Sequence, residues 1–158
     1  VVLADYRTQK NAGTTPKEAL MDAKSAMRYL KQHAMSIHVD PDKILAGGGS
    51  AGGHLAAATA FCHQINNPED DLNVSSIPKA LILFNPVIDN GPHGYGFDRV
   101  KDYYRDFSPI HNIKKDVNSI GILIFFLVHI KNFHIFPIFV QFFHIFSLPF
   151  RHFAVDLY

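Results

Sequence analysis

The chain reads KILAGGGSAGGHLA from Lys43 to Ala56. This segment predicts a buried strand, a tight glycine turn with Ser50 at its tip, and a helix that starts directly after the serine. The pattern Gly48-x-Ser50-x-Gly52 is typical of a nucleophile elbow, in which the serine takes a strained backbone conformation. We expect a side chain at Gly48 or Gly52 to collide with the neighbouring strand or helix, so that only glycine fits at both positions.

The residues around this turn supply the context that a nucleophile elbow needs. Residues 44–46 are apolar, and residues 54–61 contain no Pro or Gly and favour a helix. The turn should lift the Ser50 hydroxyl above the sheet edge, with the first amides of the following helix facing the point where an oxyanion would form. The alternative interpretation is a flexible glycine loop with a structural role alone.

Strand and helix alternate from the start of the chain. We predict a buried strand over residues 1–5, a loop over residues 6–13, and a helix that begins with a capping box at Thr15 and Glu18. The apolar residues of this helix recur at steps of three and four and predict one buried face: Ala19, Leu20, Ala23, Met27, Leu30 and Ala34.

A further strand is predicted over residues 80–84. Apolar runs that alternate with helices indicate the α/β class, with a mostly parallel sheet flanked by helices on both faces. Residues 85–113 are irregular and follow the carboxyl end of a strand, where α/β sheets place their ligand loops. Their aromatic side chains would either line an acyl or leaving-group pocket or pin the loop to the domain: Tyr95, Phe97, Tyr103, Tyr104 and Phe107.

Length, charge and cysteine content limit the class of protein. A chain of 158 residues is one domain by size, and a net charge of +1 gives no electrostatic case for binding nucleic acid. The single Cys62 cannot form an internal disulfide and reads as a small buried hydrophobe. The sequence begins at Val1 inside an apolar run. We therefore interpret the chain as a fragment, and its cellular location stays open.

The composition changes abruptly at the end of the chain, and we therefore set a domain boundary after residue 116. Residues 117–158 are dominated by Phe, Ile and His, and their only charged residues are Lys131, Arg151 and Asp156. One interpretation is an ordinary final strand and helix, with a strand over residues 120–128. We prefer an aberrant apolar tail that arose from a frameshift or a mis-joined exon.

Two other interpretations of this tail are disfavoured. A membrane helix needs about 20 uninterrupted apolar residues, and polar residues and Pro137 interrupt the run. A metal site is not expected, because the four histidines lack the usual ligand spacing: His129, His134, His144 and His152.

Several blocks of sequence occur in the order of a known family: Asp5-Tyr6-Arg7, Asp22 to Leu30, Asp40 to Ile44, Gly47 to Ala56, Phe84 to Asp89, and Phe107-Ser108-Pro109. On these blocks residues 1–116 resemble the α/β-hydrolase superfamily. The specific resemblance is to the fold-3 esterase and lipase branch, which includes hormone-sensitive-lipase-like and carbohydrate-acetyl esterases. The resemblance implies a partial α/β-hydrolase fold.

The resemblance also implies roles for particular residues. Ser50 would be the nucleophile, and the amide of Ala51 would be one oxyanion donor. The acid and the histidine of the triad follow the nucleophile in chain order; Asp89 is the candidate acid, against a role as a loop-capping aspartate. We expect His54 to face away from Ser50 and to pack in the core. His93 and His111 are loop residues without supporting spacing, so a complete triad is not assigned.

The function that the resemblance implies is that of a serine-dependent carboxylic ester hydrolase. It would cleave short acyl or acetyl esters through an acyl-enzyme on Ser50, with no metal or other cofactor. Its partner would be a small ester, with an acetylated carbohydrate as one candidate. The alternative is a catalytically inactive fragment or degraded hydrolase that lacks the triad acid and base.

Overall fold

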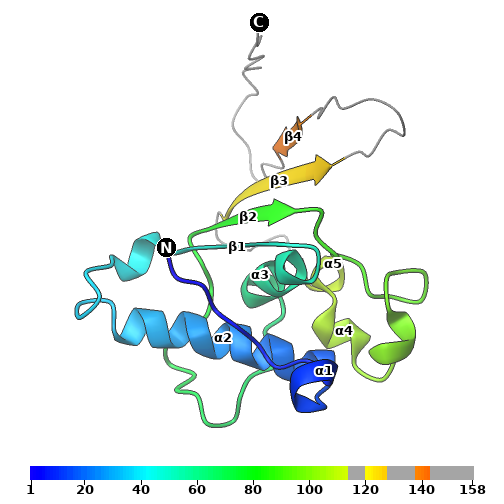
Figure 1. The fold of residues 1–158 in the computed structure, drawn as a ribbon, viewed down its shortest axis with the longest axis horizontal. Helices are drawn as coiled ribbons and strands as arrows, with labels where there is room; N and C mark the ends of the chain where they lie inside the picture. Colours follow the sequence, from blue (N-terminus) through cyan, green and yellow to red (C-terminus); the bar gives the residue numbers. More distant parts are fainter. Residues whose placement is uncertain (114–119, 128–137, 143–158) are drawn as a thin grey trace, which may run out of the picture.

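The computed structural model describes residues 1–113, 120–127 and 138–142 (Figure 1). The helices are α1 (Gln9–Ala12), α2 (Pro16–Gln32), α3 (Ala51–Phe61), α4 (Tyr104–Phe107) and α5 (Pro109–Asn112), with 3₁₀ turns η1 (Pro41–Lys43) and η2 (Phe97–Arg99). The strands are β1 (Leu45–Gly49), β2 (Ala80–Phe84), β3 (Gly121–Leu127) and β4 (Ile138–Phe142).

The four strands form one sheet in the order β1-β2-β3-β4. β1, β2 and β3 are parallel to one another, whereas β4 runs antiparallel to β3. The α/β class and the mostly parallel sheet are therefore confirmed. β2 has the predicted bounds, and β3 lies within the strand expected over residues 120–128. β4 was not predicted, because the tail sequence shows no regular period.

Helices cover one face of the sheet among the described residues. Leu81 and Leu83 of β2 are buried and pack with Ile124 of β3 against the alanines of α3. The alternate residues of β2, which point to the opposite face, are partly or fully exposed. The expectation of two covered faces is wrong for this part of the chain, because α2 packs on α3 and not on the second face (Figure 1).

The capping box predicted for α2 is present. The Thr15 hydroxyl accepts a hydrogen bond from the amide of Lys17, and the Glu18 carboxylate accepts one from the amide of Thr15 at 2.9 Å. The expected apolar face of α2 lies against α3, where Leu20 packs in one cluster with Leu55. α2 therefore fixes the position of the helix that follows Ser50.

Two buried cations also join α2 to the chain after α3. The Lys24 ammonium donates to the carbonyl oxygens of Cys62 and Ile65, at 2.7 Å each, and burial lowers its pKa to about 8. The Arg28 guanidinium contacts Asp70 at 2.7 Å and also donates to Asn66 and to the carbonyl of Val74. The loop from residue 66 to residue 74 is thus held by side chains of α2.

The first residues of the chain differ from the prediction. Residues 1–5 form no strand, and the side chains of Val1, Val2 and Leu3 are exposed. An apolar run becomes a strand only when a neighbouring strand pairs with its backbone, and the described sheet contains no partner for residues 1–5. The predicted loop over residues 6–13 contains the short helix α1, which Thr8 caps at its start and Gly13 ends at φ 65°.

The interpretations placed on the tail fall largely outside the described residues, as do the four histidines of residues 129–152. Within residues 1–113, 120–127 and 138–142, no helix has the length and hydropathy needed to cross a membrane. The same residues contain no cluster of three or more His, Cys, Asp or Glu side chains that could hold a metal ion.

Candidate active site

Ser50 lies between the end of β1 and the start of α3 in a strained conformation. Its φ of 52° and ψ of −115° are unusual for a residue with a side chain. The amide of Ser50 donates to the carbonyl of Phe84 at 2.9 Å, and the carbonyl of Ser50 accepts from the amide of His54 at 3.0 Å. Ser50 is exposed, and its hydroxyl does not cap α3. The hydroxyl is therefore presented to solvent with its backbone fixed on both sides.

The glycines of this turn have different steric roles. A Cβ on Gly48 would lie 2.5 Å from the carbonyl carbon of Gly52, which is far inside contact distance. A Cβ on Gly52 would meet nothing within 4 Å, so the expected collision at Gly52 is wrong. The second tight position is Gly53, where a Cβ would lie 2.9 Å from the carbonyl oxygen of Gly48 and 3.1 Å from Cα of Pro86. The close approach of strand and helix thus requires glycine at positions 48 and 53.

Ala51 is the first residue of α3. The first four amides of a helix have no carbonyl partner within the helix, and the helix dipole places partial positive charge there. The Ala51 amide therefore has no carbonyl partner within α3.

Asp89 lies in the loop after β2, where its side chain caps a turn. One oxygen of its carboxylate accepts a hydrogen bond from the amide of Gly91 at 2.8 Å. The same oxygen lies 3.9 Å from Nδ1 of His111, and that nitrogen is 3.0 Å from the Ser108 hydroxyl. Contacts among Asp89, Ser108 and His111 thus hold the loop after β2. Within the part of the chain that the structure describes, no hydrogen bond or ion pair joins these side chains to Ser50. His93 is an exposed residue of the same loop.

His54 is buried one turn into α3 and is only 4% exposed. Its Nδ1 donates to the carbonyl of Val87 at 3.0 Å, and its ring packs on Phe107 with the centroids 4.3 Å apart. Burial lowers the pKa of His54 to about 4, and the bond to Val87 opposes this shift only in part. The imidazole is therefore neutral at pH 7 and packs in the core, as expected from its position.

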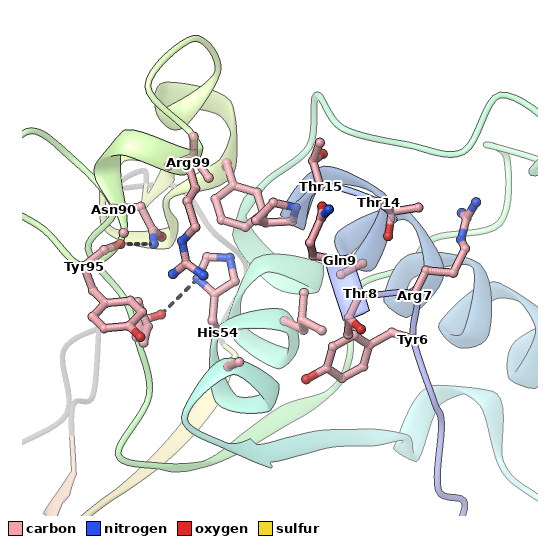
Figure 2. A pocket seen from close by; sticks show the side chains of 18 of the residues that line it. Tyr6, Arg7, Thr8, Gln9, Thr14, Thr15, His54, Asn90, Tyr95 and Arg99 are labelled. Carbon is pink, nitrogen blue, oxygen red and sulfur yellow. Dashed lines mark hydrogen bonds between the residues drawn. The ribbon is translucent and has the colours of Figure 1, made fainter. Parts of the chain in front are cut away.

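A pocket of about 710 Å³ opens beside Ala51. Figure 2 shows its wall, formed by the segment from Tyr6 to Thr15, by His54 on α3 and by the loop that carries Asn90, Tyr95 and Arg99. The loop aromatics divide between the two expected roles. Tyr95 and Phe107 line the pocket, whereas Phe97 and Tyr104 pack on each other at 5.4 Å.

The strained serine and the strand–turn–helix around it are features of esterases with the α/β-hydrolase fold. The sequence model of the BD-FAE family, a family of α/β-hydrolase esterases, matches residues 1–93. The chain belongs to the BD-FAE family. This match covers both the elbow and the segment that forms one wall of the pocket.

Solved structures of an esterase resemble this BD-FAE chain. The apo form of Thermogutta terrifontis esterase 2 is 39% identical, with a TM-score of 0.67, over 75% of this chain and 46% of that one. The same esterase phosphorylated by paraoxon is 39% identical, with a TM-score of 0.66, over 75% and 44% of the two chains. Endo-1,4-beta-xylanase B of Butyrivibrio fibrisolvens is 33% identical over 78 residues, which are 48% of this chain and 12% of that protein. The chain therefore spans less than half the length of these relatives.

Sequence reasoning missed several residues of the BD-FAE chain's site. Gly53 could have been found from the doubled glycine after Ala51, because close contact between a helix and a strand favours small residues on both. Thr14, Asn90 and Arg99 line the pocket but stand in no recognisable motif. Only the fold brings Thr14 to the same cavity as residues more than seventy positions later.

The depressed pKa of His54 predicts a dependence of stability on pH. Between pH 6.5 and about 4 the unfolded chain binds a proton at this residue while the folded chain does not. The free energy of unfolding should therefore fall as the pH is lowered through this window, by roughly 3 kcal/mol from His54 alone. Urea unfolding at a series of pH values measures this change. The free energy of unfolding should fall less steeply with decreasing pH in His54→Asn than in the unmodified protein. Equal slopes in the two proteins would contradict the lowered pKa of His54.

Proposed function

We propose that this protein is a serine-dependent carboxylic ester hydrolase that acts on short acyl or acetyl esters. The observation that carries the proposal is the strained, exposed Ser50 at the start of α3. In the reaction the Ser50 oxygen attacks the ester carbonyl and loses its proton to a base. The Ala51 amide stabilises the oxyanion, the alcohol leaves with a proton, and water then hydrolyses the acyl-enzyme.

The relatives support this chemistry. Thermogutta terrifontis esterase 2 is known in forms phosphorylated by paraoxon and phosphoramylated by tabun. Reagents of this type form a bond between phosphorus and an activated nucleophile, and Ser50 is the candidate for that role in this chain. The relative named as a xylanase favours an ester carried on a carbohydrate as one candidate substrate.

A catalytically inactive chain is the second candidate. No hydrogen bond joins the Ser50 hydroxyl to a histidine among the described residues, and Nδ1 of the nearby His54 is used by Val87. Removal of the base from a serine hydrolase lowers the rate by several orders of magnitude. In the active case we propose Asp89 as the acid of the triad, because a carboxylate can accept from the Gly91 amide and from a histidine at the same time.

Labelling with a fluorophosphonate separates these candidates. In the active case the Ser50 oxygen bonds to phosphorus as fluoride leaves, and mass spectrometry should find one adduct on the peptide that contains Ser50. Ser50→Ala should lose the adduct, while Ser36→Ala, which removes an exposed serine far from the elbow in sequence, should keep it. Absence of the adduct from chain that circular dichroism shows to be folded would overturn the esterase proposal. Asp89→Asn should slow labelling at least a hundredfold if Asp89 is the acid, and unchanged labelling would leave it as a loop cap.

A further inference from the structure

Arg99 lies in the loop after β2 and lines the pocket beside Ala51. Its guanidinium carbon lies 5.4 Å from the centroid of the Tyr95 ring, and this cation–π contact orients the side chain. Figure 2 shows Arg99 extending along the pocket wall toward Tyr95. Arg99 is exposed, so a ligand in the pocket can reach its guanidinium.

The charge of the Arg99 guanidinium is not balanced by a carboxylate of the described residues. Arg7 and Arg28 form ion pairs with aspartates at 2.7 Å, whereas Arg99 forms no ion pair and donates no side-chain hydrogen bond within the described part of the chain. An arginine side chain offers five N–H donors in a planar fork that fits a carboxylate. The fork of Arg99 is therefore available to an anion from solution.

The other charges on the pocket wall favour an anion over a cation. The described residues that line it include Arg7, Lys10 and Arg99 and no Asp or Glu. Asp22 balances the charge of Arg7, whereas Lys10, like Arg99, has no ion-pair partner among the residues that the structure describes. A cationic ligand would be repelled by both side chains, and an anionic ligand would be attracted.

The apolar part of the wall determines the second property of the ligand. Leu55, Val100 and Phe107 line the same pocket, which has a volume of about 710 Å³. An apolar chain is stabilised when it leaves water against such side chains, while a charged end needs a partner of opposite charge. A molecule with an apolar chain and one anionic end meets both requirements.

We propose that Arg99 binds a carboxylate group carried by the ester substrate. The inference rests on the proposed function, because the pocket that Arg99 lines is also lined by Ala51, the residue after Ser50. Arg99 binds the carboxylate through charge-assisted hydrogen bonds and takes no part in proton transfer, so it is a specificity-determining residue. The substrate class is then an ester with a second, ionised carboxyl group, either on its acyl part or on its alcohol part.

Matched pairs of esters isolate the effect of the charge. Monopropyl succinate, glutarate and adipate place a carboxylate at three distances from the ester carbonyl on the acyl part. Their neutral partners are propyl 4-oxopentanoate, 5-oxohexanoate and 6-oxoheptanoate, in which a methyl ketone replaces the carboxylate at nearly the same size. On the alcohol part, 4-acetoxybutanoate is paired with 5-acetoxypentan-2-one in the same way.

The first test observes Arg99 directly and needs no turnover. In Ser50→Ala with ¹⁵N-labelled arginine, the Nε resonance that disappears on the further change Arg99→Gln belongs to Arg99. At least one of the four charged esters should shift this resonance, because its carboxylate accepts a hydrogen bond from the guanidinium, while the neutral partner should leave it in place. No shift with any charged ester, or equal shifts within every pair, would overturn the subsite and leave hydration as the role of Arg99.

The second test measures specificity with the same pairs. In at least one pair the charged ester should have the higher kcat/KM by about tenfold, the size expected for a hydrogen bond to a charged group. This preference should shrink when the salt concentration rises from about 0.1 M to about 1 M, because the Debye length falls from about 10 Å to about 3 Å. The pair with the largest preference identifies the part of the ester that fills the pocket, and a preference in no pair contradicts the proposal.

Variants connect the preference to Arg99. Arg99→Gln should lower the ratio of kcat/KM within the preferred pair about tenfold, and Arg99→Lys, which keeps the charge but loses the fork, should lower it less. Arg105→Gln is the matched control. Arg105 is also exposed and lies over a tyrosine ring, Tyr104, at 5.5 Å, but it does not line the pocket, so the ratio should not change. An equal loss in Arg99→Gln and Arg105→Gln would show an effect of net charge alone and would contradict the subsite.

The outcomes separate this inference from the proposed function. Fluorophosphonate labelling of Ser50 without a preference in any pair would reject the subsite and retain the esterase. A shift of the Arg99 resonance by charged esters alone, in a chain whose Ser50 is never labelled, would reject the esterase and retain the subsite.

Discussion

Gly48→Ala should both destabilise the fold and lower the reactivity of Ser50. The new Cβ would lie 2.5 Å from the carbonyl carbon of Gly52 and 2.7 Å from its oxygen, both of which belong to backbone that cannot rotate away. α3 must then move off β1, which should cost about 2–4 kcal/mol of unfolding free energy. A shift of Ser50 and Ala51 by about 1 Å should also slow fluorophosphonate labelling by around a hundredfold.

The neighbouring glycines provide the matched controls. Gly52→Ala meets open space within a helix, so its free energy of unfolding should stay equal or rise by up to about 1 kcal/mol. The stability of Gly53→Ala should lie between those of Gly48→Ala and Gly52→Ala, because the contacts of its new Cβ with Gly48 and Pro86 are tight but longer than those at position 48. Chemical denaturation of the three variants measures their free energies of unfolding and so gives their order of stability. Equal stability of Gly48→Ala and Gly52→Ala would contradict the close packing of β1 on α3.

Arg28→Ala should cause the second large effect, a loss of about 3–5 kcal/mol of unfolding free energy. Arg28 is 6% exposed, and its ion pair with Asp70 at 2.7 Å leaves only 7% of the Arg28 side chain and 12% of the Asp70 side chain exposed. Alanine would leave the Asp70 carboxylate with its hydrogen bond from the Ser25 hydroxyl and would release the carbonyl of Val74. The loop over residues 66–74 should become the first site of limited proteolysis.

Arg7→Ala is the control for this prediction, because it removes the same side chain from an ion pair near the surface. Arg7 holds Asp22 at 2.7 Å, yet nearly half of its side chain is exposed to solvent. Exposed pairs of this kind contribute little to stability, so the denaturation midpoint should barely move. If both variants lost the same stability, burial of the Arg28 pair would not be the cause.

The core of the fold could be predicted because local signals agreed with the tertiary structure. The capping box of Thr15 and Glu18, the apolar steps of α2 and the run of β2 each contain their own evidence for helix or strand. The elbow was predictable for a related reason, since a serine between glycines after an apolar run has few structural uses. These features depend on neighbours within a few residues.

The errors concern features that depend on distant neighbours. Residues 1–5 have the composition of a strand, but pairing decides whether a strand forms, and composition does not report pairing. The collision assigned to Gly52 belongs to Gly53, because the direction of a Cβ depends on how the strand enters the helix. The free polar atoms of Thr14, His54 and Asn90 come from three separate segments. A sequence without its fold gives no sign that these atoms are buried without a partner.

The position of β1 at the margin of the described sheet has a consequence for Ser50, the proposed nucleophile. β1 pairs only with β2 there, so half of its backbone groups face away from the described sheet. Three of its five residues are glycines, which lose much conformational entropy when they are ordered. The strained geometry of Ser50 is consequently supported by β2 on one side and by α3 below, with no strand on the other flank among the described residues. In the proposed esterase, the fraction of time that Ser50 spends in its attacking conformation would therefore depend on how well β2 and α3 hold β1 in place.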